Sequence, residues 1–247
     1  MKRLYHNADG VARQIYKKKG NPEMELSELR IIDLKESILA DNDADADRLR
    51  EETKAQNVFY INVMSSPGAG KTTTLLGLTD RLRGDYKIGI LEADIDGDVD
   101  TKTMLGAGLK AVQLHTGGMC HLDADMSRQS LKEIGAEDLD LVILENVGNL
   151  VCPAEFDTGA DMNLVILSVP EGDDKPLKYP LMFEKADVVL LNKIDAMEAF
   201  DFDTESFREY VAMRNPNSPV FPVSAATGEG LDAVAEWLRG QIDAKIK

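Results

Sequence analysis

The feature that most constrains this chain is a run of apolar residues that leads directly into a glycine-rich turn. Residues 58–64 have the pattern of a buried strand, and Ser65-Ser66-Pro67-Gly68-Ala69-Gly70-Lys71-Thr72 follows them, before a helical pattern that extends to about Arg83. Glycines that let the backbone approach, a lysine and a hydroxyl are what closely packed phosphates and Mg²⁺ require. The start of the helix adds the positive end of its dipole. The sequence therefore predicts a phosphate-binding loop.

Within this loop, Lys71 is expected to reach the β- and γ-phosphates and Thr72 to bind Mg²⁺. Ser65 stands where the G-x-x-x-x-G-K-[ST] pattern has its first glycine, so the backbone there must adopt an ordinary angle. The alternative is a chance turn, but strand, Gly-Lys-Thr and helix in succession favour the phosphate loop. The residues predicted to bind the phosphates are Gly68, Ala69, Gly70, Lys71, Thr72 and Thr73.

A second motif, Asn192-Lys193-Ile194-Asp195, follows a predicted strand at Val188–Leu191. An aspartate can accept from both the ring N–H and the exocyclic amine of guanine, which adenine cannot match, so Asp195 favours GTP over ATP. Lys193 is expected to stack on the base, Asn192 to brace the loop, and the backbone of Ser224 and Ala225 to support the base. The tetrapeptide alone is a weak signal, but its position between the phosphate loop and Ser224-Ala225-Ala226 predicts a GTPase.

The chain of 247 residues is long enough for one large α/β domain. Its net charge of −16 opposes binding to nucleic acid or to anionic lipid. The apolar runs are far shorter than the ~20 residues that a membrane span needs, and the first residues lack the apolar stretch of a secretory signal. We expect a cytoplasmic protein without nucleic-acid or membrane partners.

After the phosphate loop, short apolar runs alternate with helical patterns, which is typical of βαβ units and a mostly parallel sheet. We predict an α/β fold of the P-loop GTPase kind, with helices flanking the central sheet and an N-terminal helical extension. The expected organisation is a flexible arm over residues 1–22, a helical segment packed on the domain over 23–56, and a P-loop GTPase domain over 57–247. The remaining predicted strands are Lys87–Leu91, Ala111–Leu114, Leu139–Leu144, Leu164–Val169 and Val220–Val223, and the helices lie near 123–134, 176–185, 204–213 and 230–246.

Acidic side chains follow two of these strands. After Leu91 come Glu92, Asp94, Asp96, Asp98 and Asp100. A calcium loop does not fit, because Gly97 is out of register with D-x-D-x-D-G, and a solvated acidic loop is the plain alternative. The functional interpretation places Asp94 at Mg²⁺ and makes Asp100 a candidate for positioning the attacking water.

The next core strand ends in Glu145-Asn146-Val147-Gly148, where a γ-phosphate sensor belongs. Glu145 is a candidate catalytic residue in this loop. Gly148 could offer its backbone N–H to the γ-phosphate, so the loop after it would move upon hydrolysis.

The two cysteines, Cys120 and Cys152, have informative neighbours. Cys120 precedes His121 after Gly117-Gly118, and Cys152 lies four residues beyond Gly148. Adjacent residues can share a metal only where the chain is irregular, as the two glycines suggest. Thiolates with an imidazole suit Zn²⁺ or Ni²⁺ rather than Mg²⁺, and a fourth ligand could be water or a group from a second subunit. Packing alone is the alternative for such residues, and their clustering favours a metal site.

In these motifs the chain resembles the nickel-insertion GTPases of hydrogenase maturation, the HypB family, which are P-loop GTPases of the SIMIBI class. The resemblance runs from about Ile38 to the C-terminal helix. It rests on Ser65–Thr72, Cys120–Asp123, Glu145–Asp157 and Glu171–Pro180. Serine in place of the first glycine of the loop is normal in that family.

The resemblance implies that Cys120, His121 and Cys152 bind nickel or zinc near a dimer interface that GTP favours. It also implies delivery of nickel to a hydrogenase large subunit together with a zinc-containing partner protein. Two features depart from the family: the N-terminal arm holds only His6 where some members store nickel, and Glu92-Ala93-Asp94-Ile95-Asp96-Gly97 replaces the usual E-G-D-x-x-T. We expect GTP or GDP and Mg²⁺ as cofactors, and slow turnover because no arginine finger is evident.

Three rival interpretations remain. The related GTPases of urease maturation normally carry Cys-Pro-His, whereas Ala154 follows Cys152-Pro153 here. The intact Lys71 and Thr72 argue against a regulatory module that binds metal and uses nucleotide only as a ligand. An ATP-dependent kinase of a small metabolite would require an ATP preference that Asp195 opposes.

Overall fold

The computed structural model describes residues 4–6, 12–14, 34–94 and 99–246, and the chain divides into two compact units, Met1–Asp41 and Asn42–Lys247. In the first unit, β1 (Leu4–His6) pairs antiparallel with β2 (Ala12–Gln14). The predicted N-terminal helix is present as α1 (Leu34–Ala55), and residues 23–33 lie outside the described part. The boundary of the expected arm over residues 1–22 stays a prediction.

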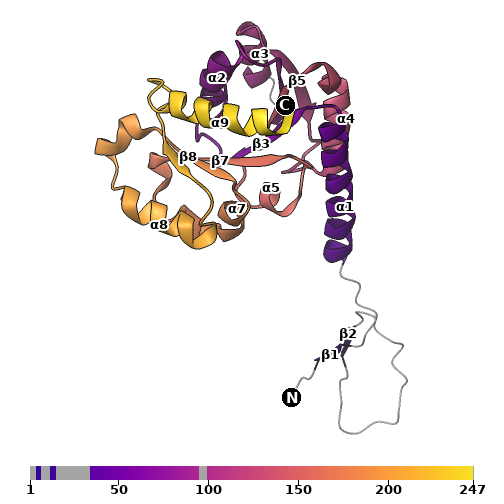
Figure 1. The fold of residues 1–247 in the computed structure, drawn as a ribbon. Helices are drawn as coiled ribbons and strands as arrows, with labels where there is room; N and C mark the ends of the chain where they lie inside the picture. Colours follow the sequence, from indigo (N-terminus) through magenta and orange to yellow (C-terminus); the bar gives the residue numbers. More distant parts are fainter. Residues whose placement is uncertain (1–3, 7–11, 15–33, 95–98, 247) are drawn as a thin grey trace, which may run out of the picture. The chain divides into compact units, whose positions relative to one another are not determined.

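Among the described residues, seven strands form one parallel sheet in the order β5-β4-β6-β3-β7-β8-β9 (Figure 1). The predicted α/β fold and all of its strands are therefore confirmed, and the strand ends move by at most three residues. The strands are β3 (Phe59–Ser65), β4 (Ile88–Asp94), β5 (Lys110–His115), β6 (Leu141–Glu145), β7 (Met162–Ser168), β8 (Val188–Asn192) and β9 (Val220–Pro222).

The helices flank this sheet. The α-helices are α2 (Lys71–Leu82), α3 (Val99–Gly106), α4 (Ala124–Glu133), α5 (Cys152–Glu155), α6 (Lys175–Lys178), α7 (Pro180–Glu184), α8 (Thr204–Arg214) and α9 (Leu231–Ile246). Short 3₁₀ turns occur at Ala136–Asp138, Val169–Glu171 and Ile194–Ala199.

The prediction of a single helix near 176–185 is wrong. Pro180 cannot donate the backbone hydrogen bond that would continue α6, and it forces Tyr179 out of the helical region, to φ −126° and ψ 60°. The chain therefore restarts as α7. Helices α3 and α5 were not predicted, since each is too short to show an apolar period.

The core lies on both faces of the sheet, because alternate residues of each strand point to opposite sides. One face packs against α2 and α9, through side chains such as Leu78 and Leu238. The other packs against α1 and α4 at one end and against α5, α7 and α8 at the other. Figure 1 shows α2 and α9 on one side of the strands and α5, α7 and α8 on the other.

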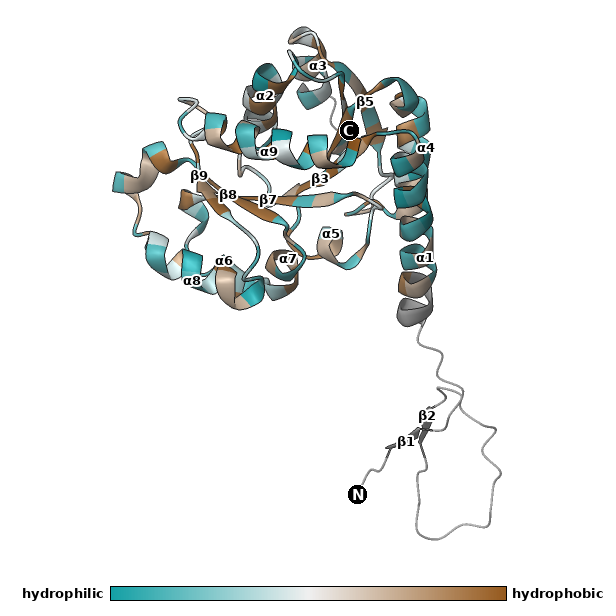
Figure 2. Ribbon diagram, viewed as in Figure 1, coloured by the Kyte–Doolittle hydropathy of each residue, from teal (hydrophilic) through white to brown (hydrophobic). Residues whose placement is uncertain are grey.

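Figure 2 shows the hydrophobic residues concentrated in the strands and hydrophilic residues over the helices, α1 and α8 in particular. Among the described residues, no helix is both long and apolar enough to cross a membrane.

A chain of amides crosses the buried sheet. The Asn146 side-chain nitrogen donates to Asn62 Oδ1 at 3.0 Å, and Asn62 Nδ2 donates to Asn163 Oδ1 at 2.9 Å. Asn146 Oδ1 accepts from the backbone N–H of Val147 at 2.8 Å, which fixes the first turn after β6. Buried polar groups cost free energy unless they are paired, so this ladder specifies how β7, β3 and the end of β6 align.

Replacing Asn62 with leucine should destabilise the protein. Asn62→Leu keeps the branching of the side chain at Cγ but leaves the Asn146 amide and the Asn163 carbonyl oxygen without their partner, at a cost of about 2 kcal/mol. Urea denaturation should show this loss, whereas Asn217→Leu at an exposed position should leave the free energy of unfolding within about 0.5 kcal/mol. Equal stability of Asn62→Leu and the parent protein would contradict the role given to the ladder.

Candidate functional site

The phosphate loop is formed where β3 ends and α2 begins. Gly68 and Gly70 adopt positive φ angles of 76° and 94°, which favour glycine. A Cβ on Gly70 would lie 2.5 Å from the side-chain nitrogen of Asn192. Ser65, in place of the expected glycine, lies in the strand itself, and its hydroxyl accepts a hydrogen bond from Lys71 Nζ at 3.1 Å. The serine therefore holds the lysine of the loop.

The four predicted catalytic residues line a single cavity of about 310 Å³. Lys71 comes from the phosphate loop, Asp94 from the end of β4, Asp100 from α3 and Glu145 from the end of β6. The parallel sheet explains this meeting, because the carboxyl ends of its strands share one edge. Asp96 and Asp98 lie outside the described residues.

Glu145 is the most perturbed carboxyl group of this cavity. Burial raises the pKa of Glu145 to about 7, and the charge of Lys71 acts in the opposite direction. One carboxylate oxygen accepts from the Thr72 hydroxyl at 3.0 Å, and the other, Oε2, is buried without a hydrogen-bond partner among the described residues. The Thr72 hydroxyl, which is bonded to Glu145, and the carboxylates of Asp94 and Glu145, which line one cavity, are oxygen ligands of the kind that Mg²⁺ prefers.

Gly148 lies against the phosphate loop. A Cβ at this position would be 3.1 Å from the backbone of Pro67, so any larger residue would crowd this approach. Both residues line the phosphate cavity. The segment predicted to sense the γ-phosphate is thus in place to do so, although its role stays a prediction.

The residues predicted to bind the base also meet. The buried Asn192 amide donates to the Ala69 carbonyl oxygen at 2.9 Å and accepts from the backbone N–H of Ala225 at 3.0 Å. Lys193 Nζ donates to the Gly68 carbonyl oxygen at 2.6 Å, and the Ser224 hydroxyl donates to Asp195 Oδ1 at 2.5 Å. The base loop and the phosphate loop are therefore joined directly.

Cys120, His121 and Cys152 are brought into one neighbourhood. Interaction with the neighbouring Cys120 thiol, together with burial, raises the pKa of the Cys152 thiol. Cys120 Sγ lies 3.8 Å from His121 Nδ1. The His121 ring stacks on Phe156 with 3.7 Å between ring centroids, and burial lowers the pKa of His121, which favours the neutral ring that binds metals.

Two thiols and a neutral imidazole fit the ligand preference of Zn²⁺ or Ni²⁺. Within the described part of the chain, no group of three or more His, Cys, Asp or Glu side chains already converges as a complete metal site.

Glu171 is a site residue to which sequence reasoning gave no role. It accepts from the Ser66 hydroxyl of the phosphate loop, and its other oxygen accepts from the backbone N–H and hydroxyl of Ser168, each at 2.7 Å. This is a capping box around Val169–Glu171. The Ser168-Val169-Pro170-Glu171 spacing could have indicated it. No local sequence pattern could have indicated the stacking of Phe156 on His121, because the two residues lie far apart along the chain.

A glycine-rich loop between β3 and α2, a base loop after β8 and a parallel sheet define a P-loop nucleotide-binding protein. The comparisons agree with this class. Residues 59–222 match the family model "CobW/HypB/UreG, nucleotide-binding domain".

The similar proteins narrow the class further. Hydrogenase maturation factor HypB of Azotobacter chroococcum is 41% identical over 222 residues, which cover 90% of this chain and 73% of that protein. The crystal structure of HypB from Helicobacter pylori in complex with nickel matches with a TM-score of 0.78 at 39% identity, over 84% of this chain and 97% of that one. HypB from Archaeoglobus fulgidus matches with a TM-score of 0.77 at 35% identity, over 83% of this chain and all of that one (100%). This chain belongs to the CobW/HypB/UreG family, in its HypB branch.

The raised pKa of Glu145 predicts a pH-dependent stability in the absence of nucleotide. The pKa of Glu145 in the folded protein, about 7, exceeds its ordinary value of 4.5. Protonated Glu145 therefore makes its full contribution to the free energy of unfolding below about pH 4.5, and this contribution is lost as pH rises through about 7. Glu145→Gln should remove this dependence, so the variant should gain up to about 3 kcal/mol relative to the parent protein between about pH 5 and 8.

Denaturation with urea at these two pH values measures the difference. Glu137→Gln, at an exposed position, is the control and should follow the parent protein. Parallel stability profiles for Glu145→Gln and the parent would show that Glu145 does not titrate as stated.

Proposed function

We propose that this chain is a GTP-hydrolysing nickel metallochaperone that helps to insert nickel into the large subunit of a [NiFe]-hydrogenase. The observation that carries the proposal is that one short segment serves two sites. Glu145 and Gly148 line the phosphate cavity, and Cys152, a few residues later, is a neighbour of Cys120. A change at the γ-phosphate would therefore act on the segment that carries a metal-binding thiol.

Selection of GTP is assigned to Asp195. Its carboxylate would accept from the two N–H donors of guanine, with Ser224 holding one oxygen in place. Asn192 would hold the base loop against the phosphate loop, and Lys193 would cover the base. Adenine lacks the two adjacent donors, so ATP should be rejected.

Hydrolysis of GTP is assigned to the phosphate cavity. Lys71 would neutralise charge on the β- and γ-phosphates, and Asp100 would position the attacking water. Thr72 and Asp94 would hold Mg²⁺, which supplies further charge neutralisation when bound. Glu145, through the Thr72 hydroxyl, would orient this part of the site. We infer slow turnover in the isolated protein, because no arginine is among the described residues that line the phosphate cavity.

Nickel or zinc would bind at Cys120, His121 and Cys152. The similar protein from Helicobacter pylori was crystallised in complex with nickel, which supports nickel as the cargo. The partners we propose are a second copy of the chain, favoured by GTP or metal, a zinc-containing nickel-insertion protein and the hydrogenase large subunit. We place this activity in the cytoplasm, where the cysteines remain thiols.

Guanine selection predicts the effect of Asp195→Asn. The asparagine keeps an acceptor for Ser224 but presents an amine to the guanine donors, so two charge-assisted hydrogen bonds are lost. GTP affinity should fall about 100-fold, or about 3 kcal/mol, in a calorimetric titration. Asp201→Asn, nearby and exposed, should bind GTP normally. Undiminished GTP binding by Asp195→Asn would place guanine recognition elsewhere.

Metal binding predicts the effect of losing a thiol. Cys120→Ala and Cys152→Ser should each lower nickel and zinc affinity at least about tenfold, because thiolates supply most of the binding energy at such sites. GDP affinity should not change in either variant. Met119→Ala, adjacent to Cys120 and exposed, is the matched control. If both cysteine variants bind metal as the parent does, the cysteines are packing residues and only the nucleotide part of the proposal survives.

A further inference from the structure

The two segments that carry the cysteines leave strands that do not touch. Cys120 follows β5 and Cys152 follows β6, and each of these strands pairs with β4 rather than with the other. Since neighbouring strands lie about 4.8 Å apart, β5 and β6 are separated by about 10 Å. Within the described sheet, no hydrogen bond joins β5 to β6 directly, so contacts made by the segments after these strands help to set the spacing of the two thiols.

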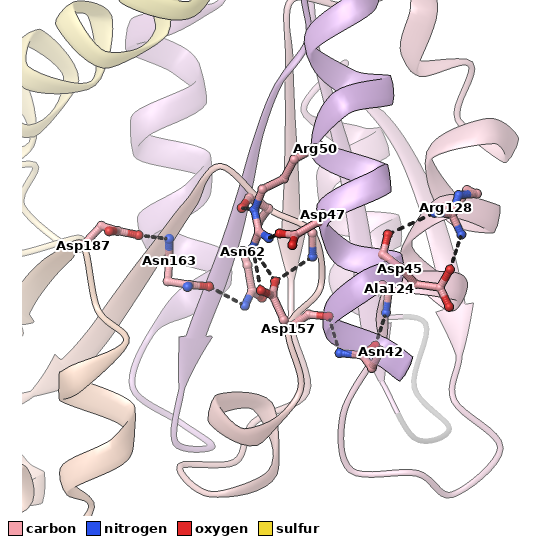
Figure 3. Close-up of polar contacts among 12 residues, drawn as sticks. Asn42, Asp45, Asp47, Arg50, Asn62, Ala124, Arg128, Asp157, Asn163 and Asp187 are labelled. Atoms are coloured by element: carbon pink, nitrogen blue, oxygen red, sulfur yellow. Dashed lines mark hydrogen bonds and ion pairs between the residues drawn. The ribbon is translucent and has the colours of Figure 1, made fainter. Parts of the chain in front are cut away.

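A single buried side chain of α1 joins the two segments. Asn42, which is 8% exposed, accepts a hydrogen bond at Oδ1 from the backbone N–H of Ala124 at 2.9 Å. Its Nδ2 donates to the backbone carbonyl of Asp157, also at 2.9 Å. Ala124 begins α4, shortly after Cys120 and His121, and Asp157 follows α5, which begins at Cys152. Figure 3 shows Asn42 between Ala124 and Asp157.

Further along α1, charged groups repeat this bridge. The Arg50 guanidinium donates to both carboxylate oxygens of Asp157, at 2.5 and 2.6 Å, and to the carbonyl of Ala160 at 3.0 Å. On the other side, Arg128 of α4 donates to the Asp45 carbonyl at 3.1 Å (Figure 3). It also donates to the Glu52 carboxylate. The same helix is thus tied to α4 and to the chain after α5.

We propose that α1, over residues 42–52, is a clamp that sets the separation of Cys120 and Cys152, with Asn42 and Arg50 as its positioning residues. The clamp adds positioning residues to the proposed metal site, and its effect on metal affinity rests on that proposed function. Its physical basis is that both hydrogen-bonding ends of a buried amide are used, so the two backbone segments are held at a fixed distance. Groups that orient metal ligands without touching the metal commonly alter affinity tenfold or more.

Two variants test the clamp in the full-length protein. Asn42→Asp keeps an acceptor for Ala124 but turns a carboxylate toward the Asp157 carbonyl, and Arg50→Ala removes the second tie without introducing a new charge. Arg48→Ala is the matched control, because Arg48 is exposed and pairs within α1 with Asp45. GDP affinity checks that each variant is folded, since the clamp residues do not line the phosphate cavity.

Two readouts are needed: nickel affinity, and the rate at which oxidised glutathione converts Cys120 and Cys152 into a disulfide. We expect nickel affinity and disulfide formation each to fall about tenfold in Asn42→Asp and Arg50→Ala, and to be unchanged in Arg48→Ala. Normal values of both in folded Asn42→Asp and Arg50→Ala would overturn the clamp.

The second readout separates the clamp from the proposed metal function. If the parent protein binds no nickel, the metal function fails, but disulfide formation still reports the thiol spacing. Slower disulfide formation in the two variants would then support the clamp, and an unchanged rate would overturn it.

Discussion

The side chain of Asn192 is the interaction on which the nucleotide site depends. This buried amide holds the phosphate loop through Ala69 and the base loop through Ala225, so two loops far apart in sequence become one site. The packing is close enough that Gly70 cannot carry a Cβ, and both partners of the amide are backbone groups. Any residue that cannot donate and accept at once would leave one loop without its support.

The parallel sheet then decides what surrounds this site. Strands β3, β4 and β6 end at the same edge, which gathers a lysine, carboxylates and the Gly148 segment around one cavity. The asparagine ladder through Asn62 and Asn146 fixes where the Gly148 segment leaves β6. Because that segment continues to Cys152, the phosphate site and the thiol pair share a mechanical connection. Coupling between them requires only that the segment have two arrangements of different metal affinity.

Much of the fold could be predicted because its signals are local. The apolar strands, the glycine turn before Lys71 and the tetrad at Asn192–Asp195 each occupy a short stretch whose chemistry restricts its structure. The break between α6 and α7 also has a local cause, Pro180, but the helical pattern of the residues around it favoured a single helix. By contrast, Asn42 bridges Ala124 and Asp157, which lie far from it along the chain. A polar residue on a hydrophilic helix carries no mark of such a partner, so only the structure could reveal it.

Nickel affinity measured in two nucleotide states tests the central claim, the coupling of the nucleotide site to the thiol pair, most directly. The protein would be titrated with nickel in excess GDP and in an excess of a non-hydrolysable GTP analogue, with its mass followed by light scattering. The account predicts that affinity or dimerisation differs between the two states, by the roughly 1–3 kcal/mol typical of coupled sites. Equal affinity and equal mass in both states would contradict it, and would leave a nucleotide site and a thiol pair that act independently.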